Sequence, residues 1–315
     1  MTANWVDVHG HFNVPALRPR PVPGWTFSPE TSLDFMDRTG VAAQLLSNYG
    51  PQATETMIAA NNAGAAIVAA HPDRFGLLAQ LPMAEPDHAL AELRRCIDAL
   101  DVEGFAIQSN YDGVYLGDPR FEPVWAELDR RQATLFIHPT PLGYDDTRLG
   151  RPGALIEAPF DTARTVVDML YAGVFRRYDG FNVILAHAGG ALPTLAGRLE
   201  TLGPWPLGWA ENPQHVTAGE MRETVARLYY DTALSGTPHS LDPVLDVTTP
   251  DHVLYGADFG GPCTYTDVCQ AHLDALRGNK RLSAAEREAV GRNALRLFPK
   301  FAKRIASAAV RVAAA

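Results

Sequence analysis

The chain has few cysteines, no long apolar run and no basic cluster, and each absence narrows what it can be. Its three cysteines, Cys96, Cys263 and Cys269, form an odd and sparse set, which fits packed thiols in a reducing cytoplasm. The N-terminus lacks the basic-then-apolar order of a signal peptide, and no segment approaches the roughly 20 apolar residues of a membrane span. We therefore expect a cytoplasmic protein without a membrane partner.

Positive charge is also scarce. The 27 lysines and arginines face 36 aspartates and glutamates, which gives a formal net charge of -9 and argues against a nucleic-acid partner. The composition, 46% hydrophobic and 20% charged, instead fits a globular chain with a substantial core. No low-complexity linker divides the sequence, so we expect residues 1–315 to form a single domain.

A short apolar run followed by a turn and a helix-like stretch recurs along the chain. The runs predicted to be strands are residues 5–12, 41–47, 75–82, 104–110, 134–139, 182–190, 228–234 and 253–260. Helices are predicted most clearly at residues 87–100 and 121–131, and again from about residue 283. Strands that alternate with helices pair in parallel, and eight such units predict a (β/α)8 TIM barrel. An open, doubly wound sheet is the structural alternative.

Histidine or aspartate stands at the end of several predicted strands, where barrel enzymes place their reactive groups. The first strand ends with His9 and His11, which are two residues apart and therefore face the same side. His138 ends the fifth predicted strand, and Asp258 lies near the end of the eighth. Three imidazoles and a carboxylate suit Zn²⁺, Mn²⁺, Fe²⁺ or Co²⁺. A lone histidine is more often structural, but together these residues predict one divalent metal site.

These residues lie in recognisable motifs. The motifs are DVHGHFNVP (7–15), FIHP (136–139), LAHAGG (185–190) and YGADF (255–259). Their order resembles the amidohydrolase superfamily, in its branch of aminocarboxymuconate-semialdehyde decarboxylase and related nonoxidative decarboxylases. Shorter stretches resemble members of the 6-methylsalicylate decarboxylase type. The resemblance spans nearly the whole chain.

The resemblance implies a distorted (β/α)8 barrel that associates as a homodimer. It makes His9, His11, His138 and Asp258 the ligands of one divalent ion, Zn²⁺ or Mn²⁺. It makes His187 the catalytic histidine beside the metal, which moves protons instead of binding the ion. A protonated Asp258 is the alternative proton donor.

Departures from the family pattern are informative too. Gln108 stands where many superfamily hydrolases carry a carboxylated lysine that bridges two metals, so we expect a mononuclear site. Arg198 falls where one of two substrate-binding arginines lies in the aminocarboxymuconate enzyme, and no counterpart of the other is found. This favours a substrate with one carboxylate. Tyr49, Tyr111 and Phe160 are further candidates for substrate contact, although aromatic residues at such spacing are more often part of a core.

These features predict a metal-dependent nonoxidative decarboxylase of a small aromatic, ortho-hydroxybenzoate-like, or unsaturated carboxylic acid. We expect no organic cofactor, because no nucleotide-binding or Schiff-base motif is present. A hydrolase of a lactone, ester or amide, or a hydratase, is the alternative. A barrel with a purely structural metal is a third reading, against which His187 counts as an extra histidine. Asp7 faces away from the ligand pair by strand parity and is interpreted as structural or supporting. Asp231 has the same ambiguity, with Thr232 and Ser235 as possible site-facing neighbours, and His239 is interpreted as structural or solvent-exposed.

Overall fold

Eight parallel strands form the centre of the molecule. The computed structural model describes residues 5–14, 17, 27–48, 50, 52–140, 150–205, 215–261 and 265–313. Within these ranges the strands are β1 (Trp5–His11), β2 (Val41–Ser47), β3 (Phe75–Gln80), β4 (Gly104–Gln108), β7 (Thr134–His138), β8 (Asn182–Leu185), β9 (Tyr229–Asp231) and β10 (Val253–Leu254). They pair in this order, each with the next and always in parallel.

The ring closes between β1 and the extended segment that follows β10. The backbone N–H of Val8 donates to the carbonyl of Tyr255 at 2.9 Å, and that of His11 donates to Phe259 at 2.7 Å. Gly10 also pairs with Phe259 in a parallel bridge. The predicted (β/α)8 barrel is therefore confirmed, and the open sheet is excluded.

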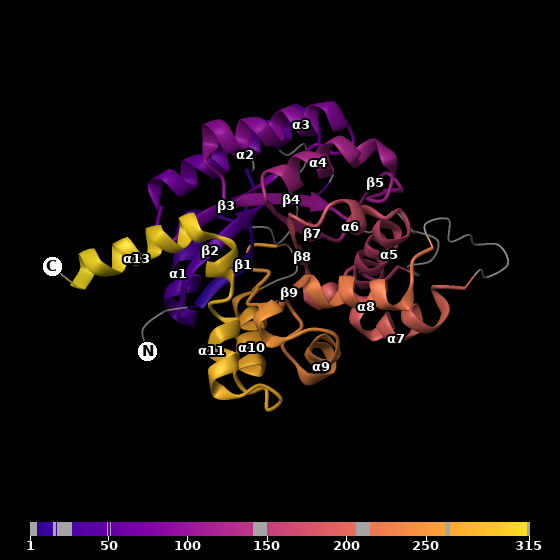
Figure 1. Cartoon of the computed structure of the whole chain (residues 1–315). Helices are drawn as coiled ribbons and strands as arrows, with labels where there is room; N and C mark the ends of the chain where they lie inside the picture. Colours follow the sequence, from indigo (N-terminus) through magenta and orange to yellow (C-terminus); the bar gives the residue numbers. More distant parts are fainter. Residues whose placement is uncertain are drawn as a thin grey trace.

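Helices surround the strands on their outer side (Figure 1). They are α1 (Pro29–Thr39), α2 (Thr54–Ala70), α3 (Pro86–Arg95), α4 (Glu122–Arg130), α5 (Glu157–Tyr171), α6 (Val174–Arg177), α7 (Leu192–Leu202), α8 (Ala218–Arg227), α9 (Pro238–Val247), α10 (Thr266–Arg277), α11 (Ala284–Val290), α12 (Ala294–Leu297) and α13 (Pro299–Ala313). A hairpin of β5 (Asn110–Tyr111) and β6 (Val114–Tyr115) follows β4. None of the described helices is long and apolar enough to cross a membrane.

Most predicted elements are present with shifted ends. The helix predicted at 87–100 is α3 followed by a π-helical turn, Cys96–Leu100. The helix predicted from about residue 283 is three helices, α11 to α13. The eighth predicted strand pairs regularly only over β10, because its remaining residues form the irregular seam with β1. Helix α13 extends away from the barrel at the C-terminus (Figure 1).

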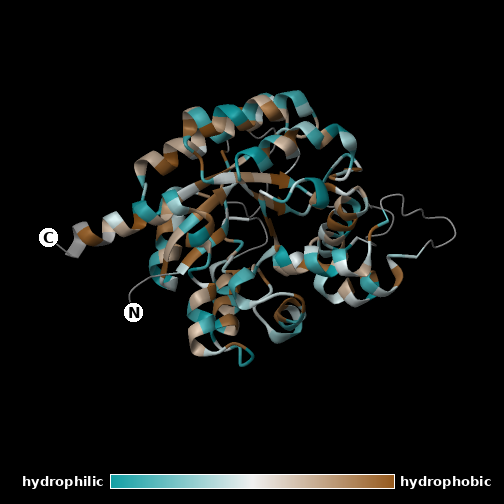
Figure 2. Cartoon of the chain, viewed as in Figure 1, coloured by the Kyte–Doolittle hydropathy of each residue, from teal (hydrophilic) through white to brown (hydrophobic). Residues whose placement is uncertain are grey.

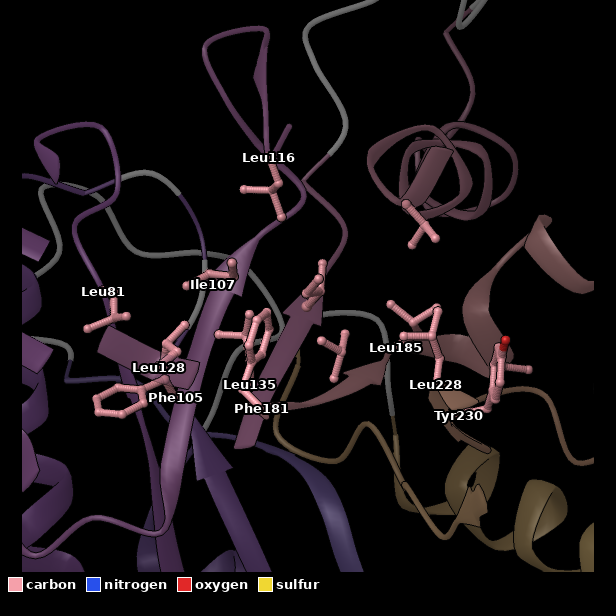
Figure 3. Close-up of a cluster of buried hydrophobic side chains, with 14 of the residues drawn as sticks. Leu81, Phe105, Ile107, Leu116, Leu128, Leu135, Phe181, Leu185, Leu228 and Tyr230 are labelled. Atoms are coloured by element: carbon pink, nitrogen blue, oxygen red, sulfur yellow. The ribbon is translucent and has the colours of Figure 1, made fainter. Parts of the chain in front are cut away.

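Two apolar layers stabilise the barrel. In β4, Phe105 and Ile107 belong to the larger cluster, which fills the space between strands and helices, while Ala106 belongs to a smaller one. The smaller cluster takes side chains from most strands and so fills the barrel interior, together with Phe298 and Phe301 near the C-terminus. Figure 3 shows part of the larger cluster, and Figure 2 shows that the strands are mainly hydrophobic. Strands buried on both faces explain the nearly continuous apolar runs in the sequence.

A β-bulge in β1 reverses which side chains point inward. Asp7 pairs with Gln44 of β2 and Gly10 pairs with Leu46, so β1 carries one extra residue over this interval. Val8 lies in the interior cluster, and simple alternation would turn His9 outward. The extra residue shifts the alternation, and the ring of His9 lies 4.9 Å from that of Phe136, an interior residue. Bulges commonly re-aim side chains next to functional sites.

The close pairing of β4 with β7 predicts a cost for any side chain at Gly104. A Cβ atom there would lie 2.6 Å from the backbone oxygen of Thr134, so the two strands would have to separate. We expect Gly104→Ala to lower the free energy of unfolding by about 1–3 kcal/mol, measured by thermal or urea unfolding. Gly197→Ala in α7 is the control, because a Cβ there meets nothing within 4 Å. Equal effects of the two substitutions would contradict the packing argument.

Candidate functional site

Four buried side chains bring their donor atoms together at the C-terminal end of the barrel strands. His9 and His11 come from β1, His138 ends β7, and Asp258 lies in the segment that closes the ring. One ligand atom from each lies within 4.8 Å of the others, and all four residues are buried. Within the described ranges, this is the one group of three or more such residues that could hold a metal ion. These are the four residues that the sequence predicts as ligands.

Hydrogen bonds fix which nitrogen of two histidines carries the proton. Nδ1 of His9 lies 2.6 Å from Oδ2 of Asp231, and Nδ1 of His138 lies 2.9 Å from the carbonyl oxygen of Pro139. A carboxylate and a carbonyl only accept hydrogen bonds, so each Nδ1 carries a proton. Nε2 of each ring is therefore the nitrogen that can bind a metal ion.

The remaining contacts of the cluster also suit a cation. Nε2 of His9 and Nε2 of His11 are 3.0 Å apart, and both lie near Oδ1 of Asp258, at 3.3 and 3.0 Å. Two imidazole nitrogens and a carboxylate oxygen thus face one another in a buried place. A divalent ion held by three nitrogens and one oxygen would satisfy them all.

The pKa values in the cluster reflect competition between burial and charge. Burial opposes the charged form of His9, yet the carboxylates of Asp231 and Asp258 together raise the pKa of this imidazole to about 10. Burial lowers the pKa of His138 well below its usual value, and the neighbouring histidines lower it further. The two carboxylates therefore favour a positive charge at this place, but the closely spaced imidazoles disfavour a charge that comes from protonation of several of them. The residues present fit a divalent metal ion.

Asp7 supports the seam without touching a ligand ring. Its Oδ1 accepts hydrogen bonds from the backbone N–H groups of His9 and Ala257, both at 2.9 Å, and its Oδ2 accepts from Nε2 of Gln44 at 2.7 Å. Burial raises the pKa of Asp7 to about 6, against the opposing effect of these hydrogen bonds. Asp7 therefore ties β1 to the closing segment, in line with the supporting role expected from the sequence.

His187 lies beside the cluster but is not one of its four donors. Its ring centroid lies 4.9 Å from that of His9 and 5.6 Å from that of His138. Nδ1 lies 3.2 Å from the carbonyl oxygen of Ala233, so it carries a proton that this oxygen accepts. Nε2 remains as the nitrogen that can exchange a proton. The side chain lines a cavity instead of packing into the barrel wall, which counts against a purely structural metal site.

A cavity of about 570 Å³ adjoins the cluster, a volume suited to a small organic molecule. His138, His187 and Asp258 contribute to its wall. The apolar part of its lining includes Ala154, Leu155, Ala158, Pro159, Ala188 and Leu234. Its further polar residues are Thr194, Ser235, His239 and Ser240. The cavity thus combines the metal cluster with a largely apolar surface.

The structure places Tyr111 in the core, away from this cavity. Its ring is buried among the residues of the larger apolar cluster. Its hydroxyl accepts a hydrogen bond from the N–H of Gln108 and lies 3.4 Å from the carbonyl of Leu81. The sequence-based assignment of Tyr111 to substrate contact is therefore corrected to a packing role.

The other predicted substrate contacts are not brought to the cavity either. Arg198 is exposed on α7, and Phe160 of α5 is 49% exposed. Neither is among the described residues that line the cavity, although Pro159 beside Phe160 is. Tyr49 lies outside the described residues.

The segment between β9 and α9 also lines the cavity, and of its residues the sequence marks only Ser235 as a possible site-facing neighbour. Leu234 and Ser235 follow β9, and His239 and Ser240 stand in the first turn of α9; all four line the cavity. His239, expected to be structural or solvent-exposed, is exposed and also contributes to the cavity wall. No motif marks these residues, but their place just after a barrel strand is a signal, because such loops carry function in this fold.

Comparison with known proteins identifies the class that this barrel and metal cluster define. A family profile described as "Amidohydrolase" matches residues 6–300. The chain belongs to the amidohydrolase family. The 6-methylsalicylic acid decarboxylase of Penicillium expansum is 30% identical, over 94% of this chain and 96% of its own.

Solved structures give a consistent result. The 2,6-dihydroxybenzoate decarboxylase from Rhizobium is 25% identical and superposes with a TM-score of 0.81, covering 95% of this chain and 99% of that one. A dihydroxybenzoic acid decarboxylase from Polaromonas, described with bound manganese and the inhibitor 2-nitroresorcinol, shares the fold. It is 22% identical, with a TM-score of 0.79 and coverage of 95% and 97%.

The metal cluster yields a direct prediction. We expect His138→Ala to weaken divalent metal binding by about 100-fold or more, because loss of a ligand should exceed the 10–100-fold that supporting residues cost. Metal content after dialysis and a manganese titration measure this. His88→Ala is the control, since His88 is an exposed residue paired with Glu85 on the surface. Undiminished metal binding by the His138 variant would contradict the assignment.

Proposed function

We propose that this protein is a metal-dependent nonoxidative decarboxylase, a carboxy-lyase that releases CO2 from a small aromatic acid of the ortho-hydroxybenzoate kind. One observation carries the proposal: the four-donor cluster and His187 both border a cavity of about 570 Å³ whose remaining wall is largely apolar. The names of the relatives support it, since proteins similar over nearly the whole chain are decarboxylases of hydroxybenzoates.

The cavity lining supports an aromatic monocarboxylate. Leu155, Pro159 and Leu234 offer apolar contacts to the faces and edges of a ring. The hydroxyls of Ser235 and Ser240 can bind polar ring substituents. No arginine is among the described residues of the lining, so a second carboxylate would find no guanidinium partner there.

His9, His11, His138 and Asp258 would hold the ion. A divalent cation bound there would supply Lewis acidity and would help to orient an anionic substrate. The protein contributes fixed geometry: the Nδ1 bonds to Asp231 and to the carbonyl of Pro139 hold two of the ligand rings in place. Rigid ligands keep the substrate oriented towards His187.

His187 supplies the proton in this proposal. Its Nε2–H protonates the ring carbon that bears the carboxylate, which interrupts the aromatic system. The bond between that carbon and the carboxylate then breaks, its electron pair restores the aromatic ring, and CO2 leaves. The hydrogen bond from Nδ1 to Ala233 holds the imidazole during the transfer. Asp258 is the alternative proton carrier.

Finer features extend the proposal. We propose that residues 1–315 act as one barrel domain and that the protein is a homodimer in the cytoplasm. Resemblance to the family supports the homodimer, and the three cysteines, few for 315 residues, support the compartment. Zinc and manganese are both compatible with three imidazoles and one carboxylate.

Release of CO2 tests the proposed reaction. Purified protein loaded with Mn²⁺ or Zn²⁺ should release CO2 from at least one of 6-methylsalicylate, salicylate and 2,6-dihydroxybenzoate, and a chelator should abolish the release. Aminocarboxymuconate semialdehyde serves as the unsaturated comparison. A metal-loaded protein that releases no CO2 from any of them, but hydrolyses esters or lactones, would refute decarboxylation.

A substitution at His187 separates proton transfer from metal binding. We expect His187→Asn to keep its metal but to lose about 10²–10⁴-fold in kcat, the usual contribution of a general acid. Metal content and steady-state kinetics measure the two effects. His252→Asn is a matched control, because its Nδ1 also faces a backbone carbonyl, that of Leu228, away from the cavity. A variant of His187 with normal turnover would remove this residue from the chemistry.

A further inference from the structure

One buried carboxylate contacts both the metal cluster and the loop that carries His187. Asp231, at the end of β9, is fully buried and is not one of the four clustered donors. Its Oδ2 lies 2.6 Å from Nδ1 of His9. Its Oδ1 accepts hydrogen bonds from the backbone N–H groups of His187, at 2.8 Å, and Ala233, at 2.9 Å. Two backbone N–H donors and a ring nitrogen of His9 therefore face its two oxygens, an arrangement that suits the ionised, acceptor-only carboxylate.

The oxygen that faces His9 determines how this histidine can bind metal. Because the carboxylate only accepts, the neutral ring keeps its proton on Nδ1 and presents the lone pair of Nε2 to a metal ion at the cluster. If a hydrogen-bond donor replaced Oδ2, the ring would be driven to the opposite tautomer. Nε2 would then carry a proton at the position where the ion binds, so replacing this one oxygen would lower the affinity for metal.

Oδ1 of Asp231 stabilises a left-handed backbone conformation at His187, which costs free energy for residues other than glycine. His187 and Ala188 have φ angles of 55° and 57°, and Gly189 continues the left-handed run at 72°. Such a conformation persists only where the surroundings over-determine it. Asp231 secures the run at its start through the N–H of His187, and it also holds Ala233, whose carbonyl accepts the hydrogen bond from Nδ1 of His187.

Asp7 provides a contrast inside the same site. It is equally buried, but it contacts His9 only through the backbone N–H, and its other partners are Ala257 and Gln44. Among these two buried carboxylates, only Asp231 has contacts to a ligand ring and to the His187 loop.

We propose that Asp231 is a positioning residue that acts through its two oxygens separately. Oδ2 keeps His9 in the tautomer that binds metal, and Oδ1 holds His187 where it can deliver a proton. The second role rests on the proposed decarboxylation; the first concerns metal affinity alone and stands without it.

Asp231→Asn separates the two roles. If the Asn amide nitrogen faced the backbone, it would meet the N–H groups of His187 and Ala233, and two donors cannot form a hydrogen bond. If it faced His9 instead, the imidazole could accept its hydrogen bond by moving the ring proton from Nδ1 to Nε2. The second orientation keeps an oxygen for His187 and Ala233. We expect about 10–100-fold weaker Mn²⁺ binding, measured by electron paramagnetic resonance of free Mn²⁺, with kcat largely restored at saturating Mn²⁺.

Asp231→Ala removes both oxygens and completes the comparison. We expect it to weaken Mn²⁺ binding as well, and to keep a kcat at least about 10-fold below that of the Asn variant even at saturating Mn²⁺, because nothing then holds the His187 loop. Asp168→Asn is the matched control: this carboxylate of α5 accepts from the backbone N–H of Gly117, away from the metal. It should bind Mn²⁺ with the affinity of the unmodified protein.

Each role has its own contradicting result. Unchanged Mn²⁺ affinity in Asp231→Asn would overturn the role at His9, whether or not the protein decarboxylates anything. A normal kcat in Asp231→Ala at saturating metal would overturn the role at His187, whereas no CO2 release by the unmodified protein would refute the proposed function instead. If the variants do not fold, NMR spectra of the zinc-loaded, unmodified protein labelled with ¹⁵N-histidine provide the test. We expect a strongly deshielded proton on Nδ1 of His9, which can be assigned through the contact of this ring with Phe136. The absence of this proton would overturn the proposal.

Discussion

The seam that closes the barrel is the constraint on which the site depends. His9 and His11 stand near the start of the chain, whereas Asp258 lies about 250 residues later, and backbone hydrogen bonds between β1 and residues 255–259 bring them together. Asp7 reinforces the seam by accepting from both of its sides. The extra residue in β1 then turns the two histidines inward. A looser seam would separate the donors even if every ligand residue were present.

The free-energy cost of removing so many polar groups from water in one place has to be offset by interactions within the site. Three imidazoles, two carboxylates and a nearby fourth imidazole lie in a part of the barrel where unpaired charge is costly. A divalent cation compensates the carboxylates and accepts the nitrogen lone pairs at once, so metal binding and the stability of the folded state are linked. The donors are buried away from water, and the hydrogen bonds that hold them also fix the distance between the metal cluster and His187. Structure and proposed chemistry therefore depend on one arrangement.

Sequence reasoning found the parts of this arrangement that follow from strand periodicity. The strand ends gave His9, His11, His138, His187 and Asp258, because carboxyl ends of parallel strands meet on one rim of a barrel. It could not foresee the bulge in β1, which depends on pairing with β2, nor the role of Asp231, which depends on tertiary contacts. Tyr111 is suggested by its residue type and Arg198 by the resemblance to the family, and the structure places Tyr111 in the core and Arg198 on the surface. His239 has no motif, and only the fold brings it to the cavity.

X-ray absorption spectroscopy of the zinc-loaded protein is the most direct test of the metal site, because it reports which atoms surround the ion. We expect one zinc per chain, with nitrogen ligands at about 2.0–2.1 Å and the outer-shell scattering of three imidazole rings, together with a carboxylate oxygen. A spectrum dominated by oxygen ligands, or one with the scattering of a single imidazole, would mean that the buried cluster does not hold the metal. Either result would remove the basis of the proposed chemistry.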